Sequence, residues 1–193
     1  MRTYAKLAAF LFLTGCPPKP VTVTGPGWPV GHPDLQCPAG TAPNGYAPPH
    51  GWEVWCEKPL PNGTSLREGP SLTWHANEQR KAEGSYADGR QNGPWLYWFP
   101  TGTPESQGSF AMGAKEGVWT TFQANGERSS EGQFVSGAEH GPWTFWNADV
   151  LTRTEGSYVL GNRDGVWLDY GPDDKPVRER IYREGRMITM REL

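Results

Sequence analysis

The chain has 193 residues, of which 18 are basic and 21 acidic, for a formal net charge of −3. An acidic chain is a poor general ligand for nucleic acid or for anionic lipid, so we expect no nucleic-acid partner. No window has helical apolar periodicity long enough to compete with strands, which excludes a predominantly helical fold.

Residues 1–15 are typical of a bacterial lipoprotein signal peptide. Arg2 and Lys6 supply positive charge before the apolar stretch Leu7–Leu13, which is too short to span a bilayer. The Leu-Thr-Gly-Cys motif that follows resembles the lipobox, in which the cysteine receives a diacylglycerol before cleavage. The resemblance implies that Cys16 is the lipidated N-terminus of the mature protein. An ordinary signal peptide with an incidental cysteine is the alternative.

We therefore expect an exported protein that is anchored to the bacterial cell envelope through lipid on Cys16, on the periplasmic or surface side of the outer membrane. Residues 16–36 are rich in proline and glycine and carry few charges, as in an extended tether. Two further parts are predicted, a disulfide-stapled segment at 37–68 and a repeat array at 69–193.

Two cysteines remain for the folded part, Cys37 and Cys56. Because exported proteins fold in an oxidising compartment, this even pair predicts a disulfide, with Trp52 or Trp55 packing on it. Closing a loop of this size stabilises the fold by about 3 kcal/mol in the chain-entropy model. A metal site is the weaker alternative, since two cysteines so far apart match no zinc spacing.

A 24-residue period runs through residues 69–193. Its blocks begin at Gly84, Gly108, Gly132, Gly156 and, incompletely, at Arg180. Further glycines follow five and nine residues after each start, a tryptophan follows after eleven, and aromatic residues after two and fourteen. A fixed period of this length predicts a repeat array, in which each unit buries its apolar surface against its neighbours.

The block that begins at Gly108 shows what each unit builds. Val118–Gln123 is rich in β-branched and aromatic residues, as in a strand, and Asn125-Gly126 favours a tight hairpin turn. Arg128–Val135 is then the return strand, and the polar Ala114-Lys115-Glu116 is expected to be a short exposed loop. We predict an all-β fold, a single elongated antiparallel sheet of β-hairpin repeats with about two strands per block.

The recurring aromatic residues have two interpretations. In a single-layer sheet they supply cohesion, at about 0.5–1.5 kcal/mol for each ring pair, or they are exposed and stack on a ligand. We favour the first. Regular strand geometry points Trp119 and Phe122 to opposite faces, unless a bulge realigns them. The predicted core rings are Tyr86, Trp95, Trp98, Phe110, Trp119, Phe122, Phe134, Trp143, Trp146, Tyr158, Trp167 and Tyr170.

This pattern resembles the MORN repeat (membrane occupation and recognition nexus) in its bacterial variant. In the first complete block it is carried by Gly84, Tyr86, Gly89, Gly93, Trp95 and Trp98. The resemblance extends from about Gly69 to Met190 and recurs in register in each later block. The resemblance implies a scaffold of β-hairpins with no catalytic residues. It also implies the antitoxin-like (YwqK-type) label that many bacterial proteins with such repeats carry. Some members are associated with lipid headgroups and others with protein partners.

No catalytic constellation, metal site or cofactor motif is evident in the sequence. The four histidines are scattered, and no nucleophile elbow or phosphate loop is present. A carboxylate recurs just before the blocks, at Glu83, Glu131, Glu155 and Glu179, with Gln107 in its place once. We interpret this ladder as a solvated row paired with nearby arginines, and the C-terminal arginine cluster as a charged sheet edge.

Three classes of function remain, and an enzyme is not among them. The first is a membrane-anchored envelope scaffold that binds a protein partner. The second is a module that binds carbohydrate or peptidoglycan through exposed tryptophans, and the third is an antitoxin-like partner that neutralises an envelope effector. Packed tryptophans favour the scaffold, whereas a row of solvent-facing rings favours the glycan.

Overall fold

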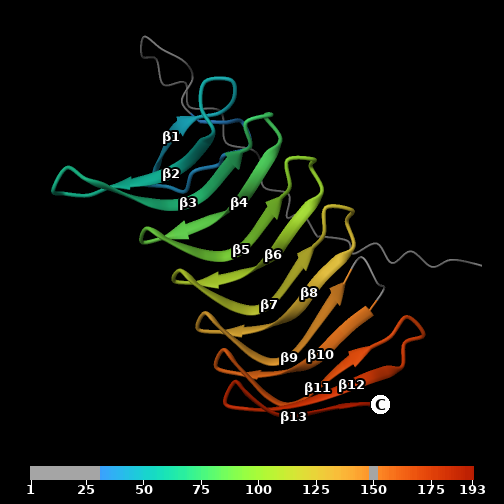
Figure 1. Cartoon of the computed structure of the whole chain (residues 1–193). Helices are drawn as coiled ribbons and strands as arrows, with labels where there is room; N and C mark the ends of the chain where they lie inside the picture. Colours follow the sequence, from blue (N-terminus) through green and yellow to red (C-terminus); the bar gives the residue numbers. More distant parts are fainter. Residues whose placement is uncertain (1–30, 148–151) are drawn as a thin grey trace, which may run out of the picture.

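The computed structural model describes residues 31–147 and 152–193 and places them in one antiparallel sheet of thirteen strands (Figure 1). The strands follow one another in sequence order, so every neighbouring pair is a hairpin. They are β1 (Ala42–Tyr46), β2 (Glu53–Pro59), β3 (Ser65–Trp74), β4 (Arg80–Ala87), β5 (Arg90–Trp98), β6 (Pro104–Ala111), β7 (Ala114–Phe122), β8 (Arg128–Val135), β9 (Ala138–Asn147), β10 (Thr152–Val159), β11 (Asn162–Tyr170), β12 (Pro176–Arg183) and β13 (Arg186–Glu192).

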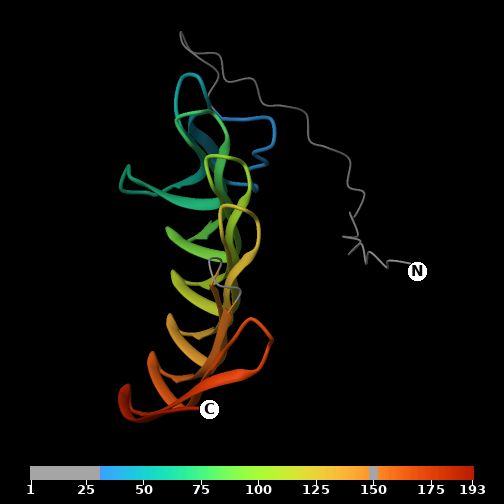
Figure 2. The same cartoon turned by 45° about the vertical axis from the view of Figure 1, so that its right-hand side comes forward.

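The predicted all-β hairpin architecture is confirmed. The hairpins are stacked along one direction, and their strands curve along their length (Figure 2). Each 24-residue block contributes two strands, and the sheet begins earlier than the repeat period indicates, at Ala42. Among the described residues there is no helix long and apolar enough to cross a membrane. The expected signal peptide, Cys16 and most of the tether lie outside the described residues.

Two-residue turns connect the strands at one end of the sheet. In the turn from β6 to β7, Met112 and Gly113 have φ angles of 49° and 88°, and positive φ at both central residues is the mark of a type I′ turn. The second glycine of each block is therefore a turn residue. The equivalent turns are Asp88-Gly89, Ser136-Gly137, Leu160-Gly161 and Glu184-Gly185.

The segment Ala114-Lys115-Glu116 is not the exposed loop that its polar composition predicts. It begins β7, and its residues pair with β6, Ala114 with Ala111 and Lys115 with Phe110. The prediction was wrong because the type I′ turn consumes only Met112 and Gly113, which leaves the next residues free to pair at once.

Longer loops connect the strands at the opposite end, such as the five residues 123–127 between β7 and β8. After β7, Gly126 N donates to Gln123 O at 2.8 Å and Gln123 N donates to Glu127 O at 2.7 Å. Asn125-Gly126 therefore lies in the turn, as its sequence predicts. The return strand β8 has the predicted bounds, Arg128–Val135.

A bulge in each block fixes which way its tryptophan points. Gly108 of β6 faces three residues of β7, Gly117–Trp119, where a regular ladder would place one. Gly117 has a φ of 71°, which suits the third glycine of the block to this position. The bulge ends at Trp119. The residues Trp119–Phe122 then follow one another along β7, and the irregularity in the ladder with β8 lies on the β8 side, where Ser129 is skipped before Phe122 pairs with Arg128. Trp119 and Phe122 therefore point to opposite faces of the sheet.

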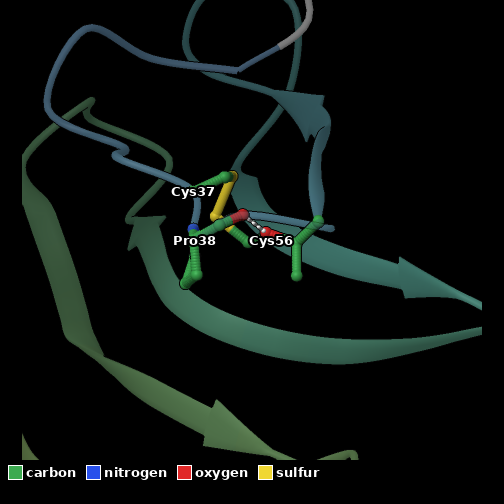
Figure 3. Close-up of a disulfide and its surroundings, with 4 residues drawn as sticks. Cys37, Pro38 and Cys56 are labelled. Atoms are coloured by element: carbon green, nitrogen blue, oxygen red, sulfur yellow. Dashed lines mark hydrogen bonds between the residues drawn. A yellow bond between two sulfur atoms is a disulfide. The ribbon is translucent and has the colours of Figure 1, made fainter. Parts of the chain in front are cut away.

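The predicted disulfide joins Cys37 to Cys56 on β2, with a Cα–Cα distance of 5.4 Å (Figure 3). It ties the segment before β1 to the sheet next to Pro38, whose carbonyl accepts a hydrogen bond from Thr41 Oγ1 at 2.7 Å. Trp52 is exposed. The ring of Trp55 contacts Gly45 on β1 and lies 4.5 Å from the Arg67 guanidinium.

Candidate interaction surface

One face of the sheet, which we call the ring face, carries an unbroken row of aromatic side chains. Strands β4 to β12 contribute one ring each, namely Tyr86, Trp95, Phe110, Trp119, Phe134, Trp143, Tyr158, Trp167 and Tyr182. Successive rings meet edge to face, with centroids 5.0–6.2 Å apart. The four tryptophans are at most 6% exposed, so this row is packed core.

Backbone contacts hold each tryptophan of the row in place. Trp119 Nε1 donates to Ser109 O at 3.0 Å, across the strand that carries Gly108. The indoles of Trp95, Trp143 and Trp167 make the same bond to Ser85, Gln133 and Ser157 at 3.1–3.2 Å. The buried N–H group therefore has a partner, which removes the cost of burying it unpaired.

Two further rings of this face are absent from the predicted core. Tyr97 stacks between Trp95 and Trp119, at 5.8 and 6.4 Å. Phe145 lies in the same way between Trp143 and Trp167, at 5.6 and 6.1 Å. Sequence reasoning missed them because the equivalent positions in the other blocks hold Thr121 and Asp169, so the position has no aromatic consensus.

Cationic side chains cover part of the ring face. Lys115 Nζ lies 4.2 Å from the centre of the Trp119 ring and 4.9 Å from that of Phe134. Arg163 covers Trp167 in the same way, at 4.5 Å. Burial against the sheet lowers the pKa of Lys115. These side chains leave the ring face little open aromatic surface for a ligand.

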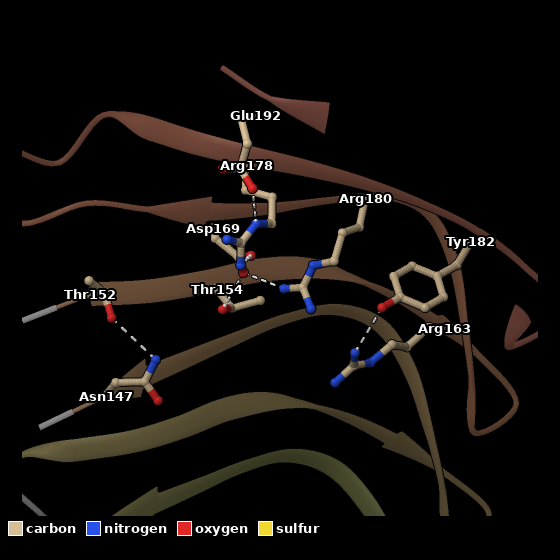
Figure 4. A network of polar contacts seen from close by, with 9 residues as sticks. All are labelled: Asn147, Thr152, Thr154, Arg163, Asp169, Arg178, Arg180, Tyr182 and Glu192. Atoms are coloured by element: carbon tan, nitrogen blue, oxygen red, sulfur yellow. Dashed lines mark hydrogen bonds and ion pairs between the residues drawn. The ribbon is translucent and has the colours of Figure 1, made fainter. Parts of the chain in front are cut away.

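Charged residues close the ring face at its C-terminal end (Figure 4). Asp169 on β11 accepts a hydrogen bond from Thr154 Oγ1 at 2.8 Å and pairs with Arg180 on β12. Arg178 joins this network through Asp169, with Nη1 and Oδ2 3.8 Å apart, and also pairs with Glu192, with Nε and Oε1 2.8 Å apart.

The opposite face, which we call the glutamate face, carries a second unbroken row in direct register. It runs from β2 to β13 through Val54, Leu72, Glu83, Leu96, Gln107, Thr120, Glu131, Thr144, Glu155, Leu168, Glu179 and Arg191. The recurring carboxylate thus lies at the middle of a face that alternates acidic or amide side chains with Leu and Thr.

The aromatic residues fourteen positions into each block lie on this second face. Trp98, Phe122, Trp146 and Tyr170 are half-buried and stand at the strand ends opposite the two-residue turns, away from the ring row. The predicted core rings thus divide between the two faces. Eight lie in the buried row and four beside the glutamate row, because an odd step of three residues separates them from the tryptophan.

Arginines accompany the carboxylates and aromatic rings of the glutamate face. Arg128 pairs with Glu131 at 3.2 Å and Arg153 with Glu155 at 2.6 Å, as the solvated-row interpretation expects. Glu179 pairs instead with Arg191 of the last strand, at 3.0 Å.

Two hollows open on the glutamate face. The first, of about 450 Å³, lies over β3 to β5 and is lined by Leu72, Arg80, Glu83 and Leu96, with Asp34 at its border. The second, of about 390 Å³, lies beside the loops that follow β7 and β11, at the end of β9 and the start of β10. Its lining includes Gln123, Glu127, Arg128, Trp146, Arg153 and Asp174.

In the part of the chain that the structure describes, reactive side chains form no cluster of metal-binding type. Within residues 31–147 and 152–193, no group of three or more His, Cys, Asp or Glu is placed to hold a metal ion. His75 Nε2 donates a hydrogen bond to Trp98 O at 2.7 Å, which ties it to the end of β5. The chemistry available on the glutamate face is therefore ion pairing, hydrogen bonding and ring stacking.

A comparison of the chain with protein-family models and with curated proteins finds no match.

Proposed function

We propose that this protein is a lipid-anchored envelope lipoprotein of the MORN-repeat type that acts as a non-catalytic scaffold, and that it binds a protein partner on the glutamate face. The observation that supports this proposal most is the row from Leu72 to Glu179, which alternates Leu or Thr with Glu or Gln over the ten neighbouring strands β3 to β12. A repeated surface of this kind suits an extended partner held by many modest contacts.

The division of the rings between the two faces supports a scaffold over a glycan binder. The tryptophans of the ring face are packed between strands, and cations cover two of them, Trp119 and Trp167. The rings on the glutamate face are half-buried and stand beside arginine and glutamate side chains. That mixture suits a polypeptide with polar and apolar side chains.

Deletion of whole blocks tests the proposal. Removing Gly108–Glu131 keeps the phase of the repeat, and removing two blocks shortens the glutamate face further. We expect the amount of partner cross-linked in intact cells to fall stepwise with each deleted block. The disulfide and the far-ultraviolet circular dichroism of a sheet should persist.

Single substitutions provide the control for catalysis. Glu131→Gln and His140→Ala change side chains that an enzyme would use, and neither should abolish binding or the cellular phenotype. Complete loss of activity with either variant, in a folded protein, would point to an enzyme and contradict the proposal.

A further inference from the structure

An exposed apolar stripe runs along the middle of the glutamate face. It is formed by the fifth residue of every second strand, β5, β7, β9 and β11, with one strand between each of these and the next (Figure 1). These residues, which we call the stripe, are Pro94, Val118, Pro142 and Val166. All of them are exposed, Val118 by 63% and Val166 by 50%. The equivalent residue of β3, Pro70, is half-buried, so the stripe begins at Pro94.

The stripe is close to straight and has a fixed spacing. Each of its members lies near the centre of its strand, so the twist of the sheet moves the strand ends more than the stripe. Neighbouring strands lie about 4.8 Å apart, so successive members of the stripe repeat about every 9.6 Å. A partner that contacts all of them needs a matching repeat.

This spacing selects the conformation of a bound chain. A polyproline II helix has three residues per turn and advances about 9.3 Å per turn, so one of its edges meets the stripe once per turn. A β-strand presents a side chain to one face about every 6.8 Å, and an α-helix advances about 10.8 Å in two turns. Over the length of the stripe the polyproline II helix falls out of register by about 1 Å and the α-helix by about 3.6 Å.

The strands between the members of the stripe supply hydrogen-bond donors. The residues directly opposite Pro94, Val118 and Pro142 are Ser109, Gln133 and Ser157. The carbonyl groups of a polyproline II helix make no internal hydrogen bonds, and proline has no N–H group, so such a chain needs donors on the protein that binds it. Hydroxyl and amide side chains are donors of this kind.

Acidic side chains border the stripe on both sides. On one side is the glutamate row, in which Glu83 lies diagonally across from Pro94. On the other side, Glu116 precedes Val118 by two residues on β7. Glu83 has no ion-pair partner among the described residues, and it lines the first hollow together with Pro94. The charge beside the stripe therefore complements a basic chain.

We propose that the stripe binds a proline-rich segment of the partner protein in the polyproline II conformation, with a lysine or arginine in each turn. Prolines of the segment lie on the stripe, and its basic side chains lie along the glutamate row, one of them at Glu83. The stripe contains no aromatic ring for a sugar to stack on, so a polypeptide is favoured over an oligosaccharide. This inference rests on the proposed scaffold function and names the chemistry of its partner.

Titration of labelled peptides into the full-length mature protein tests this inference. The probe is a fluorescent peptide of four Pro-Pro-Lys repeats, one for each member of the stripe, and its binding is followed by anisotropy. The double variant Val118→Thr/Val166→Thr should bind it about tenfold more weakly, because each threonine replaces a methyl group by a hydroxyl of similar size. The same changes at Val159 and Val177, exposed by 47% and 41% and outside the stripe, should leave binding unchanged.

Peptide length tests the match of the two periods. Affinity should rise from two Pro-Pro-Lys repeats to four and then change little, because the stripe has no further member. In a protein that lacks Gly108–Glu131, the block that carries Val118, the rise should end at three repeats. A rise that continues equally in both proteins would contradict the match.

Glu83→Gln isolates the ion pair. This variant should bind the lysine peptide about threefold more weakly and should bind four Pro-Pro-Gln repeats as the unaltered protein does. An equal effect on both peptides would contradict the pairing of Glu83 with a basic side chain.

Three further results would overturn the inference: no saturable binding at millimolar peptide, equal binding by the stripe variant and its control, or equal binding of four Gly-Ser-Lys repeats, which keep the charge without the proline. Binding of a peptidoglycan oligosaccharide that depends on Val118 and Val166, in place of the peptide, would assign the stripe to glycan and also overturn it. The scaffold proposal is tested separately, because stepwise loss of the cross-linked partner on block deletion supports it even where no proline-rich peptide binds.

Discussion

The indole of Trp119 covers Gly108 on the neighbouring strand so closely that a methyl group on that glycine would lie 2.2 Å from the ring. The same distance is 2.1–2.2 Å for Trp95 over Gly84, Trp143 over Gly132 and Trp167 over Gly156. The first glycine and the tryptophan of each block are thus one packing unit, and the period of the sequence is the period of this contact.

Substitution of Gly108 by alanine should destabilise the protein by about 3 kcal/mol, because the new methyl group has to displace the buried indole. Gly117→Ala, in the same block, is the matched control. Its Cβ meets nothing within 4 Å, so only the positive φ opposes it, at about 1–2 kcal/mol. Urea unfolding of both variants measures the difference. Equal destabilisation by the two variants would mean that the close contact between Gly108 and the Trp119 ring does not determine the cost of the substitution.

Reduction of the disulfide, or a Cys37→Ser/Cys56→Ser double variant, should lower the free energy of unfolding by about 3 kcal/mol. The loss should be local, because units of a repeat array contact only their neighbours. Hydrogen exchange should accelerate in β1 to β3 and remain unchanged in β9 to β13. Faster exchange throughout the sheet would show that the disulfide stabilises the fold globally.

The alkaline stability of the sheet should depend on Tyr97. Burial raises the pKa of Tyr97, so the folded state favours the neutral phenol. The stability that this group contributes is complete below about pH 10, the pKa of an unfolded tyrosine, and is lost as the pH rises through the higher folded value. The melting temperature of the unaltered protein should therefore fall more steeply above pH 10 than that of Tyr97→Phe.

The titration of Lys115 changes the stability of the fold in the opposite direction over the same pH range. Burial lowers its pKa, so its cost to stability is present at neutral pH and is relieved as the pH rises. The unaltered protein and the Tyr97→Phe variant both contain Lys115, so the difference between their melting curves reports on Tyr97. Parallel curves for the two proteins would contradict a buried neutral phenol.

Cys16→Ser should either leave an uncleaved precursor or release a soluble protein, because the serine cannot receive a diacylglycerol. Fractionation of cells and immunoblotting of the two fractions measure this. Unchanged partitioning of the variant with membranes would rule out the lipid anchor.

The repeat period predicted the sheet, its hairpins and the return strand Arg128–Val135, because glycines and aromatics mark turns and strands locally. The disulfide followed from the even number of remaining cysteines and from the oxidising compartment that we expect for an exported protein. Which face each ring occupies did not follow, since it depends on the three-residue bulge at Gly117–Trp119, whose position relative to the tryptophan shows only in the strand register.

The candidate interaction surface was the least predictable part. The glutamates were recognised as a ladder, but their alternation with Leu and Thr of the neighbouring strands arises from register between residues far apart in the chain. The contact of Asp34 with Arg80 joins residues separated by 46 positions. No local pattern in the sequence predicts a contact over such a separation.

The location of the partner on the glutamate face is the central claim, and site-specific photo-cross-linking tests it most directly. A photoreactive amino acid at Val118 or Val166, on the glutamate face, is compared with one at Leu160 or Met112, in the two-residue turns. The pairs are matched in exposure, 63% against 64% and 50% against 47%. The account predicts a specific cross-linked partner from Val118 and Val166 alone. Cross-links that arise equally from the turns, or only from them, would contradict it.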